Sequence, residues 1–173
     1  MILNSLVLEN FRNYKKQEVK FNPNINIISG QNASGKTNLL EAICFLALTK
    51  SFLAKKEEDA ILFGEPKSKI SASLDAHNRR LTVDIELGKR NQKNVFLNGI
   101  RQPRLADFIG TFNCVLFCPD DLSLVQGYST TRRRFLDTTL SQLNKNYLSA
   151  LSKFNKVIEQ KNSFLKKYIP SLE

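Results

Sequence analysis

One segment of eight residues limits the possible folds more than any other part of the sequence. It reads Gly30-Gln31-Asn32-Ala33-Ser34-Gly35-Lys36-Thr37 and fits the pattern G-x-x-x-x-G-K-[ST]. The two glycines let successive backbone amides point at phosphate oxygens. The lysine reaches the β- and γ-phosphates, and the threonine hydroxyl binds Mg²⁺. The pattern predicts a phosphate-binding loop for a nucleotide, with Thr37 as the Mg²⁺ ligand.

The neighbours of this loop support the same prediction. Strand-forming residues from Ile25 to Ser29 run directly into Gly30, and good helix formers follow from Lys36 to Leu48. Apolar residues lie on nearly every face of that helix, which is typical of a helix buried inside a layered fold. We therefore expect an α/β fold of the P-loop NTPase type, with the loop between a strand and a buried helix.

Other segments predict further strands. Apolar alternation and turn signals predict strands at 2–8, 19–21, 69–75, 81–87 and 94–97. A continuous apolar run at 112–117 predicts a central strand, and the polar segment 50–68 predicts an excursion with one turn of helix. Asn98-Gly99, directly after the strand at 94–97, is a strong signal for a hairpin turn.

The pattern changes after residue 130. Apolar residues then step by three, four or seven along one helical stripe: Leu136, Leu140, Leu143, Tyr147, Leu151, Phe154, Ile158 and Leu165. This spacing predicts a helix of about thirty residues that ends before Pro170. Such a stripe is usually a packing face. We therefore expect residues 1–130 to form the P-loop lobe and residues 131–173 to begin a helical lobe.

Positive charge is concentrated in the same C-terminal part of the chain. The net charge is +10, and residues 131–169 hold nine Lys and Arg against only Asp137 and Glu159. A basic face of this density attracts polyanions such as nucleic acid. A solvated helix surface has the same composition, so both interpretations stay open.

Three arginines, Arg132-Arg133-Arg134, follow Thr130-Thr131, which we expect to cap a helix. Cations in a first helical turn oppose the helix dipole, so an anion should lie near them. Asp120 and Asp121 would supply it by folding back, and the phosphate of DNA or of a nucleotide is the alternative. For Arg12 as well, the anionic partner is either a protein carboxylate or the phosphate of DNA or of a nucleotide.

The sequence also argues against several classes of protein. The longest apolar run, Ala42 to Leu48, is seven residues long, against the ~20 that cross a bilayer. The N-terminus has no basic region of a signal peptide. Three cysteines and the single His77 make neither a disulfide framework nor a zinc site. We expect a reduced, cytosolic protein without a structural metal, in which the cysteines are small core residues.

The acids that a P-loop NTPase needs for hydrolysis are not evident. A carboxylate at the end of an apolar strand normally holds Mg²⁺, and another polarises the attacking water. The apolar run that ends near acids is Val115 to Asp121, and Pro119 makes its end a loop. We therefore do not expect this chain alone to hydrolyse ATP efficiently, and its catalytic residues stay unassigned.

Five blocks of the sequence match a known family. They are Asn10 to Tyr14, the P-loop running into Asn38 to Ile43, Ser51-Phe52, Phe117 to Gly127, and Arg132 to Asp137. Together they resemble RecF, a family of bacterial recombination mediators with an ABC-type ATPase head related to the heads of SMC proteins. The resemblance covers essentially the whole chain.

The resemblance implies a fold, ligands and partners. The fold is an ABC/SMC-type head, with a mixed central sheet around the P-loop helix. The implied protein binds ATP, Mg²⁺ and DNA, and its heads form a homodimer around two nucleotides on duplexes, junctions, gaps or stalled forks. It would promote recombinase loading with RecR and RecO in DNA repair, replication and the SOS response.

The resemblance also transfers residue roles. Gly30, Gln31, Asn32, Ala33, Ser34, Gly35, Lys36 and Thr37 carry over as the ATP site. Arg12 carries over as a second contact to nucleotide or DNA, and Asp120 lies about where ABC proteins place their Q-loop glutamine, which suggests a metal- or water-sensing role.

The departure from the family is length. Family members are much longer, and their signature motif and Walker B acids lie in the other half, so this chain looks like the N-terminal portion. Two other classes stay open. One is a small-molecule P-loop kinase, and the other is a fragment that binds DNA by charge alone, independently of ATP.

Overall fold

The computed structural model describes residues 1–54, 56–76, 78–90 and 92–168. The chain divides into two compact units, Met1–Cys118 and Pro119–Glu173. The division therefore falls at the end of the apolar segment 112–117, earlier than the boundary after residue 130 that the sequence suggests.

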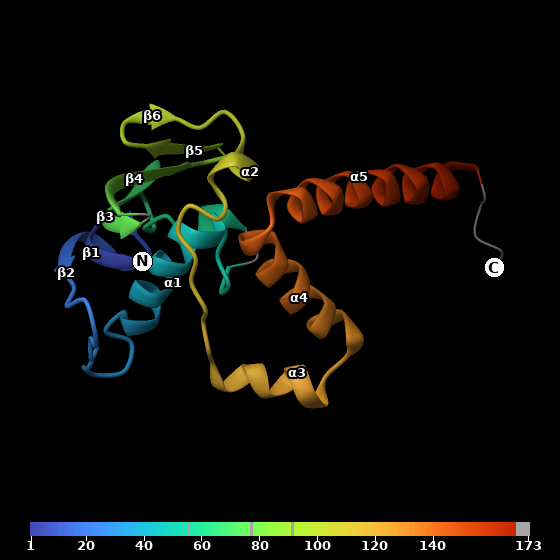
Figure 1. The fold of residues 1–173 in the computed structure, drawn as a ribbon. Helices are drawn as coiled ribbons and strands as arrows, with labels where there is room; N and C mark the ends of the chain where they lie inside the picture. Colours follow the sequence, from blue (N-terminus) through green and yellow to red (C-terminus); the bar gives the residue numbers. More distant parts are fainter. Residues whose placement is uncertain (55, 77, 91, 169–173) are drawn as a thin grey trace. The chain divides into compact units, whose positions relative to one another are not determined.

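The first unit is built on a six-stranded sheet with the strand order β2-β1-β3-β4-β5-β6 (Figure 1). Its strands are β1 (Ile2–Phe11), β2 (Tyr14–Lys20), β3 (Lys67–Ala76), β4 (Arg79–Gly88), β5 (Gln92–Leu97) and β6 (Ile100–Arg101). All of the pairings between them are antiparallel. In β3, every second residue from Ser68 to Ala76 is buried, so one face of the sheet carries the core.

The helix α1 (Lys36–Leu48) supplies the other half of this core (Figure 1). Its buried residues pack with apolar side chains of β1, β3 and β4, which include Leu6, Leu8, Ile70, Leu74 and Ile85. The rings of Phe45 in α1 and Phe11 in β1 meet edge to face, with their centroids 6.1 Å apart. Packing against the sheet therefore fixes α1 and, with it, the loop that precedes it.

Most of the elements predicted for this unit form. The helix occupies 36–48 as predicted, and β3 and β4 form the predicted hairpin. The turn at Asn98-Gly99 joins β5 to β6, and both residues have positive φ, 51° and 77°. The polar excursion contains one helical turn, η1 (Glu57–Ala60), and a short helix α2 (Leu105–Phe108) precedes residue 112.

Two predicted strands, 25–29 and 112–117, are wrong. Neither segment is a strand, and neither pairs with β1 to β6. Parallel strands are stable when neighbours cover both faces, yet the exposed fractions of Ile27 and Val115 are 88% and 92%. Because these segments find no ladder partner in the described part of the chain, the sheet there is antiparallel rather than mixed.

The second unit is helical. It contains η2 (Pro119–Leu122), α3 (Ser123–Gln126), α4 (Ser129–Leu143) and α5 (Lys145–Tyr168). The prediction of one long helix is wrong, because Asn144 leaves the helical conformation with φ −139° and ψ 109°. Its side-chain oxygen accepts hydrogen bonds from the amides of Asn146 (2.9 Å) and Tyr147 (3.1 Å), and so caps the start of α5.

The predicted cap of the arginine helix is also wrong. Residue Tyr128, not a threonine, is the N-cap of α4, and both Thr130 and Thr131 lie inside the helix. The guanidinium of Arg132 donates to the carbonyl oxygens of Gly127 (2.9 Å) and Leu124 (3.5 Å). The cation therefore lies against backbone carbonyls of the segment before the helix.

Candidate functional site

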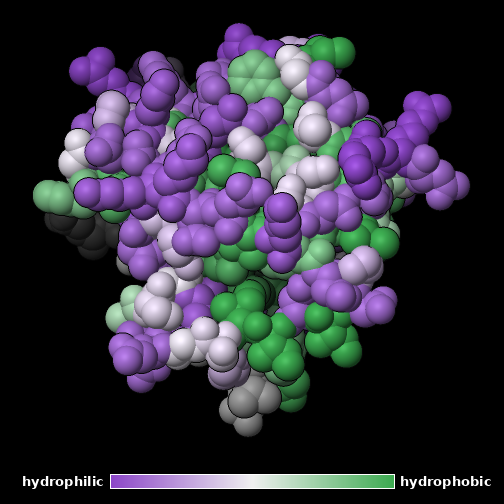
Figure 2. Space-filling model, turned by 90° about the vertical axis from the view of Figure 1, so that its left-hand side faces the viewer, coloured by the Kyte–Doolittle hydropathy of each residue, from purple (hydrophilic) through white to green (hydrophobic). Residues whose placement is uncertain are grey.

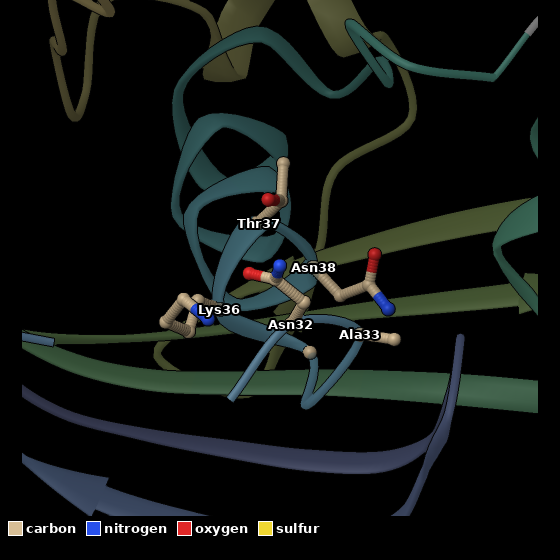
Figure 3. A pocket seen from close by; sticks show the side chains of 6 residues that line it. Asn32, Ala33, Lys36, Thr37 and Asn38 are labelled. Atoms are coloured by element: carbon tan, nitrogen blue, oxygen red, sulfur yellow. The ribbon is translucent and has the colours of Figure 1, made fainter. Parts of the chain in front are cut away.

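The loop 30–37 surrounds a small cavity at the start of α1. The cavity has a volume of about 230 Å³. It is lined by Asn32, Ala33, Gly35, Lys36, Thr37 and Asn38 (Figure 3). Figure 3 shows these side chains projecting from the loop and from the first turn of the helix, with Lys36 and Asn38 on opposite sides. The structure thus brings five of the eight predicted loop residues together around one space, and Gly30, Gln31 and Ser34 are not among its lining residues.

The ammonium group of Lys36 lies within the loop. Its Nζ donates to the carbonyl oxygens of Gln31 at 2.6 Å and of Gly30 at 2.8 Å. A lysine held there places a positive charge beside the backbone of the loop. The motif predicts that the oxygens of a polyphosphate bind in the same region. The contact of Lys36 with phosphates stays a prediction.

The start of α1 has the chemistry of an anion site. Its N-cap is Gly35, which provides no side-chain cap, and the first turn contains no acidic residue. The first backbone amides of the helix therefore have no side-chain acceptor in their own cap, and they carry the positive end of the helix dipole. Amides, an ammonium and a hydroxyl from Thr37 form a set of donors and ligands that fits phosphate with Mg²⁺.

Gly35 is the position where the loop tolerates no side chain. Its φ is 103°, which an L-residue with a side chain rarely adopts. A Cβ atom there would lie 2.8 Å from the side-chain amide of Asn13 and from the hydroxyl of Tyr14. The turn after β1 thus lies directly behind the phosphate-binding loop. From the sequence, Tyr14 is expected in the core, against which it packs here, and Asn13 and Asn38 enter only through the family resemblance. No spacing rule links the three residues to Gly35.

Arg12 is held by protein groups. Its Nε and Nη2 donate to the two carboxylate oxygens of Glu41 at 2.7 Å and 2.6 Å, and its Nη1 donates to the carbonyl of Asp59 at 2.7 Å. The Glu41 side chain is fully buried, and it also accepts from the hydroxyl of Ser51. This network joins the turn after β1, the helix α1 and the excursion after α1. The predicted contact of Arg12 to nucleotide or DNA stays a prediction.

The other predicted site residues belong to the second unit. The side chain of Asp120 lies outside the part of the chain that the structure describes. Arg133 and Arg134 are exposed on α4, as is Arg132 apart from its carbonyl contacts. Their predicted role in DNA binding stays a prediction.

The three cysteines are free thiols: Cys44 lies in α1, and Cys114 and Cys118 lie at the end of the first unit. The Sγ atoms of Cys44 and Cys114 are 3.9 Å apart. The hydrogen bond between the two thiols, and then burial, raise the pKa of the Cys44 thiol, whereas the same contact lowers the pKa of Cys114. Within the described ranges, no group of three or more His, Cys, Asp or Glu could hold a metal ion. No helix among those residues is long and apolar enough to cross a membrane.

Comparison with known proteins agrees with this architecture. A family model described as an AAA domain matches residues 5–171. The DNA replication and repair protein RecF of Streptococcus gordonii is 45% identical over 166 residues, and that of Shouchella clausii is 43% identical. The alignment with the Streptococcus gordonii protein covers 96% of this chain and 46% of the relative. The chain thus spans less than half the length of these curated relatives.

Solved structures give the same result. The structure of the recombination mediator protein RecF with ATP superposes with a TM-score of 0.91 at 31% identity, over 99% of this chain and 46% of that one. A structure from work on ATP-driven dimerisation of SMC ATPases has a TM-score of 0.65 at 20% identity, over 80% of this chain and 99% of that one. The second likeness concerns the fold alone.

The fold and the loop therefore define a P-loop head fold of the ABC/SMC type, and the matched model places the chain in the AAA-domain family. Within that class, the chain belongs to the RecF family.

Proposed function

We propose that this protein binds ATP together with Mg²⁺ through residues 30–37 and acts in DNA replication and repair. The observation that carries the proposal is the cavity ringed by the loop, with the Lys36 ammonium held on loop carbonyls beside an uncapped helix start. In this proposal Lys36 binds the β- and γ-phosphates and Thr37 binds Mg²⁺. The relatives named RecF, and the RecF structure with ATP, support it.

Binding of labelled ATP tests the nucleotide site. We expect Lys36→Ala to lose most of the affinity, because the charge inside the loop is removed. Lys69→Ala is the matched control, since Lys69 pairs with Asp84 on the sheet, away from the loop, and the variant should bind like wild type. Equal affinity of wild type and Lys36→Ala would refute the assignment of the site.

We extend the proposal to DNA. The nine Lys and Arg of residues 131–169 support an electrostatic contact to the phosphate backbone, with Arg132, Arg133 and Arg134 as the candidate residues. By resemblance to RecF, ATP would drive homodimerisation of the head on duplex or junction DNA, near gaps or stalled forks. RecR and RecO would be partners in recombinase loading and in the SOS response, in the cytoplasm.

A salt titration of DNA binding with and without ATP tests this extension. The slope of log K against log salt is negative. If Arg133 and Arg134 contact phosphates, replacing both by Ala should reduce the magnitude of this slope by about 2, roughly one unit for each contact. Binding that ATP leaves unchanged, but that salt still weakens, would favour DNA binding by charge alone.

We propose separate roles for the two parts of this chain and for the further region that the longer relatives have. Residues 1–130 would be the nucleotide-contacting lobe, and residues 131–173 the start of a helical lobe. Catalytic acids would come from a region that the curated relatives have beyond the matched part, so we expect this chain alone to bind ATP without efficient turnover. A steady-state phosphate-release assay on the chain alone checks this, and rapid turnover would contradict it.

A further inference from the structure

Two polar side chains, those of Asn13 and Tyr14, lie behind the phosphate-binding loop, and a third, that of Asn38, lines the cavity and contacts Asn13. Asn13 belongs to the turn between β1 and β2, Tyr14 is the first residue of β2, and Asn38 lies in the first turn of α1. Their contacts to the loop are side chain to backbone, and they reach two consecutive carbonyl groups, those of Ser34 and Gly35. Side chains that only packed against the loop would not need to donate hydrogen bonds to two successive carbonyl groups.

Tyr14 holds the peptide group between Gly35 and Lys36. Its hydroxyl donates to the Gly35 carbonyl at 3.1 Å, and the amide of Leu39 donates to the same oxygen at 3.0 Å. In a trans peptide the C=O and the N–H point in opposite directions. Two donors on the carbonyl therefore fix the direction of the Lys36 amide, which belongs to the residues lining the cavity.

Asn13 holds the preceding peptide group in the same way. The Nδ2 of Asn38 donates to the Oδ1 of Asn13 at 2.9 Å. This contact leaves the Nδ2 of Asn13 to donate to the Ser34 carbonyl, at 3.4 Å. Asn38 thus sets the orientation of the Asn13 amide, and Asn13 in turn directs the Gly35 amide.

The surroundings of Tyr14 suit a permanent donor. The hydroxyl lies so close to Gly35 that a Cβ on this glycine would be 2.8 Å from it. Burial raises the pKa of Tyr14, which keeps the phenol protonated across the physiological range.

We infer that Tyr14 and Asn13 are positioning residues of the nucleotide site, which aim two consecutive loop amides at a phosphate group, and that Asn38 orients Asn13. The inference rests on the proposed nucleotide site. It adds a device outside the G-x-x-x-x-G-K-[ST] pattern that sets the direction of the amide donors before a ligand arrives.

The variant Tyr14→Phe tests the inference, because it removes the hydroxyl and keeps the ring. Calorimetric titration with ATP should give an affinity about three- to tenfold weaker, as expected for one hydrogen bond. Amide hydrogen exchange of residues 34–38, measured without nucleotide, should be faster. The melting temperature should stay close to that of wild type, since the packing is unchanged.

Tyr147→Phe is the matched control. Tyr147 also donates its hydroxyl to a protein oxygen, that of Asp137, but it lies in the second unit. This variant should leave both ATP affinity and exchange at 34–38 unchanged. Wild-type affinity and wild-type exchange in Tyr14→Phe would overturn the inference, even if Lys36→Ala had lost binding. If wild type itself bound no ATP, the proposed function would fail, and the exchange data would still test the positioning role.

A double-mutant cycle tests the part of Asn38. If Asn38 acts by orienting Asn13, then Asn13→Ala and Asn38→Ala should each weaken ATP binding, and the double variant should lose little more than either single one. Losses that multiply would show that the two residues act separately, with Asn38 contacting the ligand directly, and would overturn the orienting role.

Discussion

At the scale of single residues, Glu41 has the most demanding environment of the first unit. Its side chain is fully buried, and Arg12 and Ser51 use both of its carboxylate oxygens. We expect Glu41→Gln to lower the free energy of unfolding by about 3 kcal/mol, because the guanidinium loses its counter-charge while it stays largely enclosed. Urea denaturation measures this change.

An exposed ion pair provides the control for that variant. Arg80 and Asp75 are 3.1 Å apart on the outside of the β3–β4 hairpin, and 71% and 40% of their side chains are exposed. Solvent screens such a pair, so Asp75→Asn should leave the denaturation midpoint unchanged. A Glu41→Gln protein as stable as Asp75→Asn would refute the structural role of the buried pair.

The neighbouring thiols should react at different rates. The raised pKa of Cys44 leaves less thiolate at a given pH, and the side chain is 4% exposed. The lowered pKa of Cys114, and its partial exposure, act in the opposite direction. Iodoacetamide at pH 8 should therefore label Cys114 well before Cys44, as followed by peptide mass spectrometry. Faster labelling of Cys44 would contradict the geometry.

At the scale of elements, the break between α4 and α5 depends on one side chain. Asn144 caps α5 through two amides. We expect Asn144→Ala to lower the stability of the second unit by about 1 kcal/mol, the usual cost of a lost N-cap, and Asn144→Asp to retain it. Circular dichroism melts of the two variants measure the difference. Equal melts for Ala and Asp would show that the side chain does not cap the helix.

Local signals explain which elements the sequence could predict. The start of α1 follows from the glycine at 35, and the hairpin turn at 98–99 follows from an Asn-Gly pair, so both needed only neighbours in the chain. The apolar runs at 25–29 and 112–117 predicted strands wrongly, because a strand also needs a partner that the pattern does not contain. The stripe after residue 130 likewise gave no warning of the break at Asn144.

The same limit applies to the candidate site. The loop was predictable because its glycines and lysine follow from the backbone geometry of phosphate binding. The partners of Arg12 were not, since Glu41 and Asp59 lie 29 and 47 residues further along the chain. The hydrogen bonds from Asn13 to Ser34 and from Tyr14 to Gly35 each join residues that are 21 positions apart, and likewise follow no spacing rule.

At the scale of the whole molecule, hydrophobic surface is the most telling feature. On the face shown in Figure 2, hydrophilic side chains cover most of the surface, and hydrophobic ones are grouped in its lower half. The five most exposed large apolar side chains described in the first unit are Phe63, Val115, Ile27, Phe117 and Ile25, at 101%, 92%, 88%, 81% and 79%. All of them except Phe63 lie in the two segments that find no strand partner.

We expect the chain alone to self-associate through these segments as its concentration rises. Unpaired backbone with apolar side chains is a template for pairing with another copy. Replacing Ile27 and Val115 by Thr should reduce the association seen by light scattering, and replacing the equally apolar but buried Ile70 should not reduce it. A wild-type chain that stays monomeric at high concentration would contradict this expectation.

The uncapped start of α1 has a consequence for protein engineering. A designer seeking heat resistance would place Asp or Ser at position 35 and a glutamate in the following turn, because these changes normally strengthen a helix. Here each change would place an oxygen or a negative charge beside the first backbone amides of α1, which have no side-chain cap. At position 35 itself, a φ of 103° and the contacts that a Cβ would make with Asn13 and Tyr14 exclude such a side chain whatever property is selected. Selection for thermal tolerance alone would therefore act through acidic residues in the first turn, at the expense of the proposed phosphate site.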